Sequence, residues 1–404
     1  MRETLISDPA GLIERARQRD VAGDYGGAEA LLREALGALA DARRSSAAVL
    51  ASARLAELLR YLGRLDEAEV HATTAFDAAQ RLPESPDRDA VLAEALAVAA
   101  LVRVERGSDG AEEILRRARR AAERAPDAPT RDRALFAVLI ATGSMERARG
   151  EYPAAARAFR RARREAERAF GPDSVEVAHA LNDLGMAHKF DGRFRAAAAC
   201  YGHAQRIVQS TLGADHPDLA SIEHNLGGLE HARGAFDRAE PHARRAVELR
   251  ARYFGADHPL VLMDRAALAA ILDARGRSGD AEHLLRGAID GLSRSLGPDH
   301  DELAVNLNNL AAIVARRGRL ADAEKLYRRA LAIRERASGP DSARLAVTLY
   351  NLASVRRRRG DPASAEALLR RAITVLDGRV DPDHPTLRAA RASLDRLLER
   401  HAGR

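Results

Sequence analysis

The sequence predicts an all-α protein built as a stack of helical hairpins, that is, an α-solenoid. Three observations support this prediction: apolar residues recur at helical spacing, a glycine recurs at a constant interval through most of the chain, and alanines follow that glycine at fixed distances. Because one hairpin cannot bury both of its apolar stripes alone, further copies must cover them. We therefore expect about nine hairpins and a C-terminal capping helix.

The clearest copy of the repeat runs from His300 to Asp341. An apolar stripe at helical spacing fills its first half, Gly318 interrupts the pattern, and a second stripe follows until Gly339 and Pro340. The unit is therefore expected to be two helices joined by a tight turn. The apolar positions are Leu303, Leu307, Leu310 and Val314 in the first helix, then Leu320, Ala323, Tyr327, Ala330 and Leu331 in the second.

The turn glycine marks every copy of the unit. Its spacing is constant from Gly150 to Gly360 and varies slightly upstream. Alanine stands five and twelve residues after most of these glycines, as Ala323 and Ala330 do, because closely crossing helices need small side chains. The series predicts nine hairpins and comprises Gly23, Gly63, Gly107, Gly150, Gly192, Gly234, Gly276, Gly318 and Gly360.

Repeat regularity divides the chain into three expected parts: divergent repeats over 1–168, regular repeats over 169–382 and a capping helix over 383–404. The first helix, expected at about 9–21, carries Arg15 at a core position, which an end repeat can accept because one side of it faces water. In the last helix Asp395 replaces the usual glycine or alanine. We expect it to face solvent.

Composition narrows the class of protein. The 65 basic and 59 acidic residues give a net charge of only +6, so no strongly basic surface is indicated. A single cysteine, Cys200, excludes an internal disulfide and is typical of a reducing compartment. The most apolar run, Ala90–Val102, contains Glu94 and is too short to span a bilayer, and no signal peptide is visible. We expect a cytoplasmic protein without a membrane segment.

Several local motifs accompany the 42-residue period: LNNLA, GR-x-x-x-AE, LYRRAL-x-I-x-E and GPDH. On these motifs the chain resembles tetratricopeptide repeats of the kinesin light chain type, strongly over about residues 150–390 and more weakly before. The resemblance implies a right-handed superhelix whose concave side is lined by the first helix of each hairpin. Because no sustained heptads occur, it does not imply the coiled coil of a kinesin light chain.

In such repeats the side chains just before the LA or LG pair face the groove. Asparagine recurs there, and its amide can donate to and accept from the backbone of an extended peptide. The alternative is that asparagine ties neighbouring repeats together. Ala267 interrupts the series, so a peptide would be held at two separated places. The candidate groove residues are Asn182, Asp183, His224, Asn225, Asn308, Asn309, Tyr350 and Asn351, followed one turn later by Lys189, Arg316 and Arg357.

Arginine beside these asparagines favours a peptide with acidic side chains, although Arg357 could equally belong to a solvated helix end. We expect a scaffold that binds a segment of a partner protein. A peptide-responsive regulatory sensor acting on a separate effector is the alternative. Nucleic-acid binding is a weaker rival, because carboxylates are interspersed and groove aromatics are few.

No sequence feature predicts a catalytic or metal centre. The junction histidines, such as His216 and His258, are a repeat apart and cannot converge on one ion, and His179, His224 and His231 lack acidic or cysteine ligands on the same face. No phosphate-binding loop or hydrolase motif occurs. We therefore expect no enzyme activity, no cofactor and no bound metal.

Overall fold

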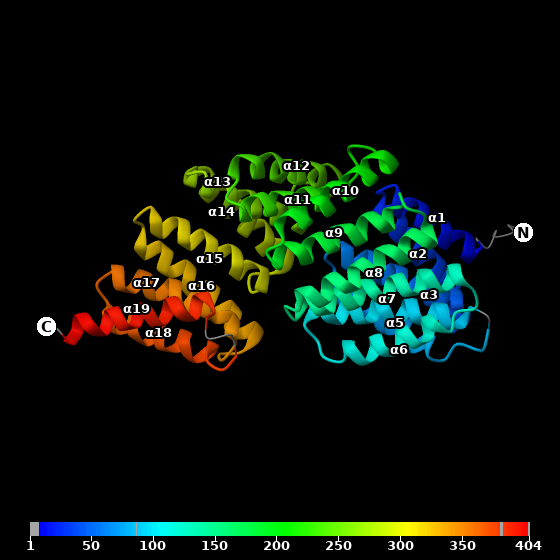
Figure 1. Ribbon diagram of the computed structural model, residues 1–404, viewed down its shortest axis with the longest axis horizontal. Helices are drawn as coiled ribbons and strands as arrows, with labels where there is room; N and C mark the ends of the chain where they lie inside the picture. The colour runs from blue at the N-terminus through cyan, green and yellow to red at the C-terminus, as the bar shows by residue number, and fades with distance from the viewer. Residues whose placement is uncertain (1–7, 86, 380–382, 403–404) are drawn as a thin grey trace, which may run out of the picture. The chain divides into compact units, whose positions relative to one another are not determined.

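The computed structural model describes residues 8–85, 87–379 and 383–402. These residues form 19 α-helices and two short 3-10 helices, with no strand among them (Figure 1). Consecutive helices pair as hairpins, namely α1 with α2, α3 with α4, α5 with α6, α7 with α8, α9 with α10, α13 with α14, α15 with α16 and α17 with α18, and α19 comes last. The prediction of an all-α protein built from repeated helical hairpins with a C-terminal helix is confirmed.

The chain forms two compact units, whose division falls within α12 (Phe236–Phe254). Unit 1 comprises Met1–Gly234 and Glu248–Tyr253. Its helices are α1 (Pro9–Val21), α2 (Tyr25–Ala38), η1 (Ala40–Ala42), α3 (Ser46–Tyr61), α4 (Leu65–Ala79), α5 (Arg88–Arg106), α6 (Ala111–Glu123), α7 (Ala128–Ala148), α8 (Tyr152–Phe170), α9 (Val175–Phe190), α10 (Phe194–Leu212) and α11 (Asp218–Ala232).

Unit 2 comprises Ala235–Val247 and Phe254–Arg404. It contains the most regular repeats and the C-terminal helix. Its helices are α13 (Pro259–Ala274), α14 (Ser278–Leu296), α15 (Asp301–Arg316), α16 (Leu320–Ser338), η2 (Ala343–Leu345), α17 (Ala346–Arg358), α18 (Pro362–Leu376) and α19 (Pro385–Ala402). Asp395 in α19 is exposed, as predicted.

The turn glycines end the first helix of every hairpin. All nine have a positive φ, for example 85° at Gly318. A side chain with a Cβ rarely adopts this left-handed conformation, which reverses the chain directly after the helix. The turns predicted from the glycine series are therefore present.

The core consists of small residues set against large ones. Ala323 and Ala330, like the equivalent alanines of the other regular repeats, are fully buried. A Cβ added to Gly185 would lie 2.5 Å from a ring carbon of Tyr201, and the same relationship joins Gly143 to Phe159. The glycine therefore leaves the space that the aromatic ring fills.

Charged side chains connect consecutive hairpins of unit 2. Glu282, which is 7% exposed, accepts hydrogen bonds from Arg286 on its own helix and from Arg317 and Arg319 at the next turn. The hydrogen bond from Arg319 foremost, and then that from Arg286, lower the pKa of Glu282 to about 2 although burial opposes the shift. Glu240 with Arg275 and Arg277, and Glu324 with Arg356 and Arg359, repeat the arrangement. We call it the inter-repeat clamp.

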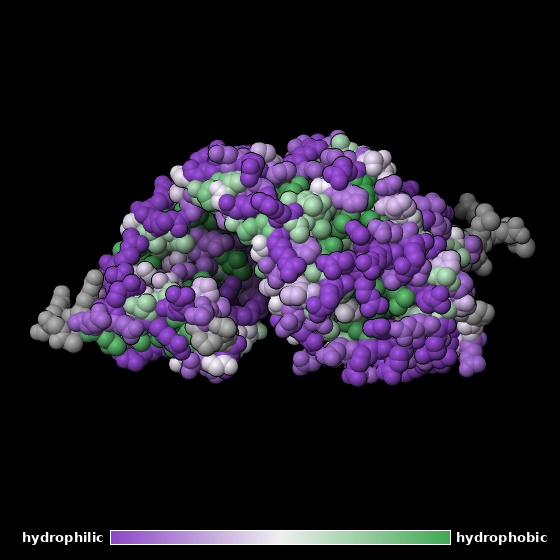
Figure 2. Space-filling view, in the orientation of Figure 1, coloured by the Kyte–Doolittle hydropathy of each residue, from purple (hydrophilic) through white to green (hydrophobic). Residues whose placement is uncertain are grey.

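Figure 2 shows a face covered mainly by hydrophilic side chains, with small apolar areas between them. Among the described residues, no helix combines the length and the hydropathy that a membrane span requires.

Candidate functional site

The first helices of unit 2 present the same four rows of side chains on one face. Each row recurs at the repeat period from α13 to α15 to α17. Since positions i, i+4, i+7 and i+11 share one side of a helix, the rows are contiguous, and we call them the inner face of unit 2. The rows are Met263, Val305, Val347; then Ala267, Asn309, Asn351; then Ala270, Ala312, Ser354; then Ala274, Arg316, Arg358.

The first row is apolar and exposed. Met263, Val305 and Val347 are 36%, 42% and 44% exposed, although most aliphatic side chains of the repeats are buried. These three residues were not among the predicted groove residues. Their signal was available, since they recur at the repeat period one turn before the asparagine position and outside the core stripe.

The asparagines of unit 2 have different partners. Asn351 Nδ2 lies 3.4 Å from Asn308 Oδ1, so this pair joins α17 to α15. Tyr350 is partly buried against the core. The half-exposed amide of Asn309 has no side-chain hydrogen bond within the part of the chain that the structure describes. Asn309 is therefore the amide of this row that is available to a ligand.

Positive charge lies at the end of the same face. Arg316 forms an ion pair with Asp273 of α13 and is partly neutralised by it. Arg357 and Arg358, at the end of α17, are exposed and form no ion pair with any described residue. These two side chains leave positive charge beside the asparagine row.

The remaining predicted groove residues lie in unit 1. Asn225 is buried and donates from Nδ2 to Asn182 Oδ1 at 2.9 Å, so this pair also joins neighbouring first helices. Burial raises the pKa of Asp183, and burial together with Arg147 lowers the pKa of Lys189. The Lys189 ammonium lies 4.9 Å from the centre of the Phe190 ring.

The eleven predicted residues thus do not form one uniform row of amides. Five of them belong to unit 1 and six to unit 2. Four of the asparagines are bonded in two separate pairs, Asn182 with Asn225 and Asn308 with Asn351. His224 in α11 is half-buried.

The junction histidines cap helices. Nδ1 of His258 and of His300 each lies 3.3 Å from a backbone nitrogen two residues later, which donates to it at the start of α13 and α15. Within residues 8–85, 87–379 and 383–402, no three His, Cys, Asp or Glu side chains could hold one metal ion.

Stacked hairpins, left-handed turn glycines and an exposed face on the first helices define a helical repeat protein. A family model described as tetratricopeptide repeat matches residues 267–336 and 302–377, and one described as MalT-like TPR region matches residues 116–295. The chain belongs to the tetratricopeptide repeat family. This fold supports a protein–protein interaction scaffold.

Solved structures with similar helical repeats include BtubC (BKLC) from P. vanneervenii, with 26% identity, a TM-score of 0.48, and coverage of 57% of this chain and 92% of that one. A putative kinesin light chain from Podosopora anserina has 20% identity, a TM-score of 0.44, and coverage of 51% and 99%. A Rap protein complexed with Competence and Sporulation Factor has 13% identity, a TM-score of 0.53, and coverage of 89% and 99%. No curated protein matches the chain in sequence.

Proposed function

We propose that the protein is a non-catalytic scaffold that binds an extended, acidic segment of a partner protein on the inner face of unit 2. One observation carries the proposal: the exposed apolar row lies beside the available amide of Asn309 and beside two arginines, Arg357 and Arg358, that form no ion pair with any described residue. The Rap protein, which shares the fold, was crystallised with a Competence and Sporulation Factor, and this precedent supports a ligand held by the repeats.

The period of the inner face suits an extended chain. Neighbouring helices pack about 8–10 Å apart, and an extended chain advances about 3.3 Å per residue. Every third residue of the ligand would therefore meet the next first helix. Apolar side chains of the ligand would contact Met263, Val305 and Val347, while the Asn309 amide would donate to and accept from its backbone.

Acidic side chains would lie toward the end of α17. Arg357 and Arg358 have no carboxylate of their own among the described residues, so a ligand carboxylate would neutralise them. Arg316 would need to share its charge with Asp273. The ligand should therefore carry its carboxylates on the side of Arg357.

The unit 1 residues form a separate part of the proposal. Asn182, Asp183, Lys189, His224 and Asn225 would contact a second segment of the partner. The Asn182–Asn225 hydrogen bond already uses part of their capacity, so we assign the principal binding role to unit 2.

Selection of a random peptide phage library on the full chain, followed by fluorescence anisotropy with a labelled synthetic copy of the enriched peptide, tests the proposal. The variant Asn309→Ala should bind this peptide roughly 2- to 10-fold more weakly, since the lost hydrogen bond contributes about 0.5–1.5 kcal/mol. Val305→Ser with Val347→Ser should also weaken binding.

Val70→Ser provides the matched control, because Val70 is the most exposed large apolar residue of the described chain and lies on a second helix, α4. It should leave the affinity unchanged. If the inner-face variants bind as tightly as the natural chain, or if the enriched peptides contain neither apolar nor acidic residues, the proposal is wrong.

A further inference from the structure

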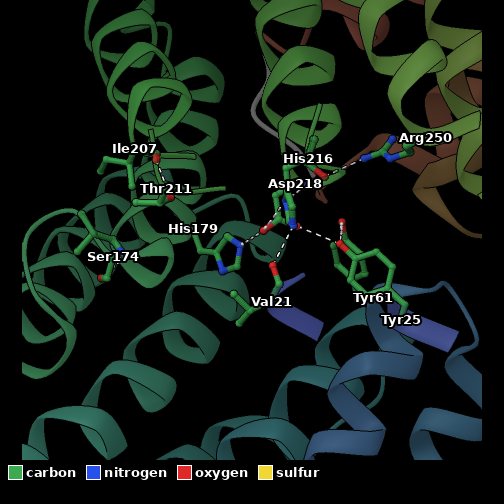
Figure 3. A network of polar contacts seen from close by, with 12 residues as sticks. Val21, Tyr25, Tyr61, Ser174, His179, Ile207, Thr211, His216, Asp218 and Arg250 are labelled. Carbon is green, nitrogen blue, oxygen red and sulfur yellow. Dashed lines mark hydrogen bonds and ion pairs between the residues drawn. The ribbon is translucent and has the colours of Figure 1, made fainter. Parts of the chain in front are cut away.

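The first hairpin of unit 1 touches the start of α11, although 193 residues separate the two segments (Figure 3). In a solenoid each repeat is expected to contact only its neighbours. Here the turn after α1 lies against the junction that precedes α11. We call the contacting residues the clasp; they are Val21, Gly23, Tyr25, His216, Pro217 and Asp218.

His216 forms one side of the clasp and is 6% exposed. Its Nδ1 lies 3.2 Å from the backbone N–H of Asp218 and accepts from it, so Nε2 carries the hydrogen and donates to the Val21 carbonyl at 3.0 Å. His300, at the equivalent place two repeats later, forms only the first of these hydrogen bonds within the described part of the chain. His216 therefore joins the two ends of unit 1 as well as capping a helix.

Tyr25 forms the other side and is 6% exposed. Its hydroxyl lies 3.2 Å from Asp218 Oδ1 and 3.4 Å from the Tyr61 hydroxyl. The second carboxylate oxygen of Asp218 lies 3.3 Å from His179 Nε2, on α9. Asp218 is thus bonded both to the first hairpin and to the fifth.

Gly23 shows how closely the two segments pack. A Cβ added there would lie 2.8 Å from Pro217 Cγ, whereas a Cβ added at any of the other eight turn glycines would meet nothing within 4 Å. At Gly23 the backbone is covered by Pro217, which belongs to a hairpin far along the chain and not to the adjacent one. The contact is therefore specific to the first hairpin.

The clasp closes a circle of contacts. Consecutive hairpins of unit 1 pack on one another, and the clasp returns from the sixth to the first. Charged side chains of the first helices meet along this circle: Arg60 of α3 donates to Glu105 of α5 at 2.7 Å, and His179 of α9 lies 3.3 Å from Asp218 of α11. Burial, together with the charges of Glu57 on α3 and of Asp218, raises the pKa of Asp20 on α1 to about 6. We call this charged surface the inner face of unit 1.

We propose that the clasp is a reversible gate that, while docked, keeps another polypeptide from entering the inner face of unit 1 from the side. The clasp consists of a few hydrogen bonds and one proline contact, whereas the hairpins meet through interlocking apolar helices. It should therefore open before the hairpins separate. The gate would have to open before the second partner segment proposed for unit 1 could enter from the side, and it is independent of peptide binding by unit 2.

Access of a bulky reagent to the inner face tests the gate. In the full chain carrying Cys200→Ser, the exposed Glu57 is replaced (Glu57→Cys) as a reporter of the inner face. We compare its reaction rates with two reagents by mass shift. One is the small N-ethylmaleimide, and the other is a 5-kDa polyethylene glycol maleimide, which is about as large as a short polypeptide chain. Docking of the clasp should slow the polymer reagent and leave the small reagent fast.

Tyr25→Phe removes the hydrogen bond to Asp218, and Gly23→Ala adds the Cβ that meets Pro217. Each should raise the polymer reaction rate about tenfold or more, the change expected for loss of a hydrogen bond to a charged group, without changing the rate of the small reagent. Tyr152→Phe and Gly63→Ala are matched controls at the same repeat positions. Gly63 has the same left-handed backbone without the proline contact.

Either of two results would overturn the gate. In the first, the polymer labels the reporter of the natural clasp as fast as N-ethylmaleimide does; in the second, Tyr25→Phe and Gly23→Ala match their controls. A Val70→Cys reporter on α4 should react equally with both reagents in every variant, which excludes global unfolding as the cause of faster labelling.

Discussion

The Glu282 carboxylate lies 2.7 Å from Nη1 of Arg317, so the second helix of one hairpin is bonded to the turn of the next. Arg319 on the other side of Gly318 bonds the same carboxylate. Because Glu240 and Glu324 repeat the contact, the inter-repeat clamp ties successive hairpins of unit 2 at fixed positions. The clamp adds hydrogen bonds, which depend on direction, to the apolar packing between hairpins, which does not.

Glu282→Gln should destabilise the protein by about 1–3 kcal/mol, because it leaves three arginines without their shared carboxylate. Glu366→Gln is the matched control at the same repeat position, since Glu366 pairs with Arg370 on its own helix and no arginine of a following turn pairs with it among the described residues. It should cost under about 0.5 kcal/mol. Urea denaturation measures both values, and equal costs would contradict the role of the clamp.

Acid should loosen the same contacts. The arginines lower the pKa of Glu282 to about 2 from an ordinary value of 4.5. A lowered folded-state pKa means that the stabilisation is complete above pH 4.5 and is lost as the pH falls toward 2. The free energy of unfolding should therefore fall through this window by a smaller amount in Glu282→Gln than in the natural chain. An identical acid loss in both proteins would count against this account.

Gly185→Ala should destabilise unit 1 by about 1–3 kcal/mol, because the new Cβ would overlap the Tyr201 ring. Gly202→Ala, on α10 of the same hairpin, meets only Arg206 at 3.7 Å and should stabilise by about 0.5–1 kcal/mol. Thermal unfolding of the two variants should thus shift in opposite directions. Stabilisation by both would show that Gly185 is a simple helix glycine.

The repeat fold could be predicted because its signals are local and periodic. Gly318 and its copies mark every turn, and the stripe that begins at Leu303 is buried as expected. The inter-repeat clamp was visible only as the motif GR-x-x-x-AE. Its pairing across hairpins depends on how neighbouring units are rotated, which the spacing alone does not give.

The clasp could not be predicted from the repeat. Tyr25 and Asp218 meet because the curvature of six consecutive hairpins brings them together, and small rotations at each junction accumulate over that distance. For the candidate groove, the sequence predicted which helices and which positions along them would carry its residues. Which amides are available depended on side-chain pairing, as the Asn308–Asn351 hydrogen bond shows.

The pair of His179 and Asp218 should bond α9 to α11 more strongly at neutral pH than in alkali. Burial opposes the imidazolium, but the hydrogen bond and charge of Asp218, with Glu176 and Asp183, outweigh burial and raise the pKa of His179 to about 9. A raised folded-state pKa means that the stabilisation is complete below pH 6.5 and is lost as the pH rises through 9.

Nuclear magnetic resonance titration of the His179 ring measures this pKa directly. Asp218→Asn should bring it down toward the ordinary value of 6.5, whereas Tyr152→Phe should leave it near 9. A His179 that titrates near 6.5 in the natural chain would contradict the pairing.

Site-specific photo-cross-linking tests whether the inner face of unit 2 holds the ligand. A photoreactive p-benzoylphenylalanine is placed at Val305 in one protein and at Val70 in another, both exposed apolar sites. The peptide enriched by phage selection should cross-link efficiently to the protein labelled at position 305 and not to the one labelled at position 70. Cross-linking at 70, or none at 305 while the peptide still binds, would contradict the account.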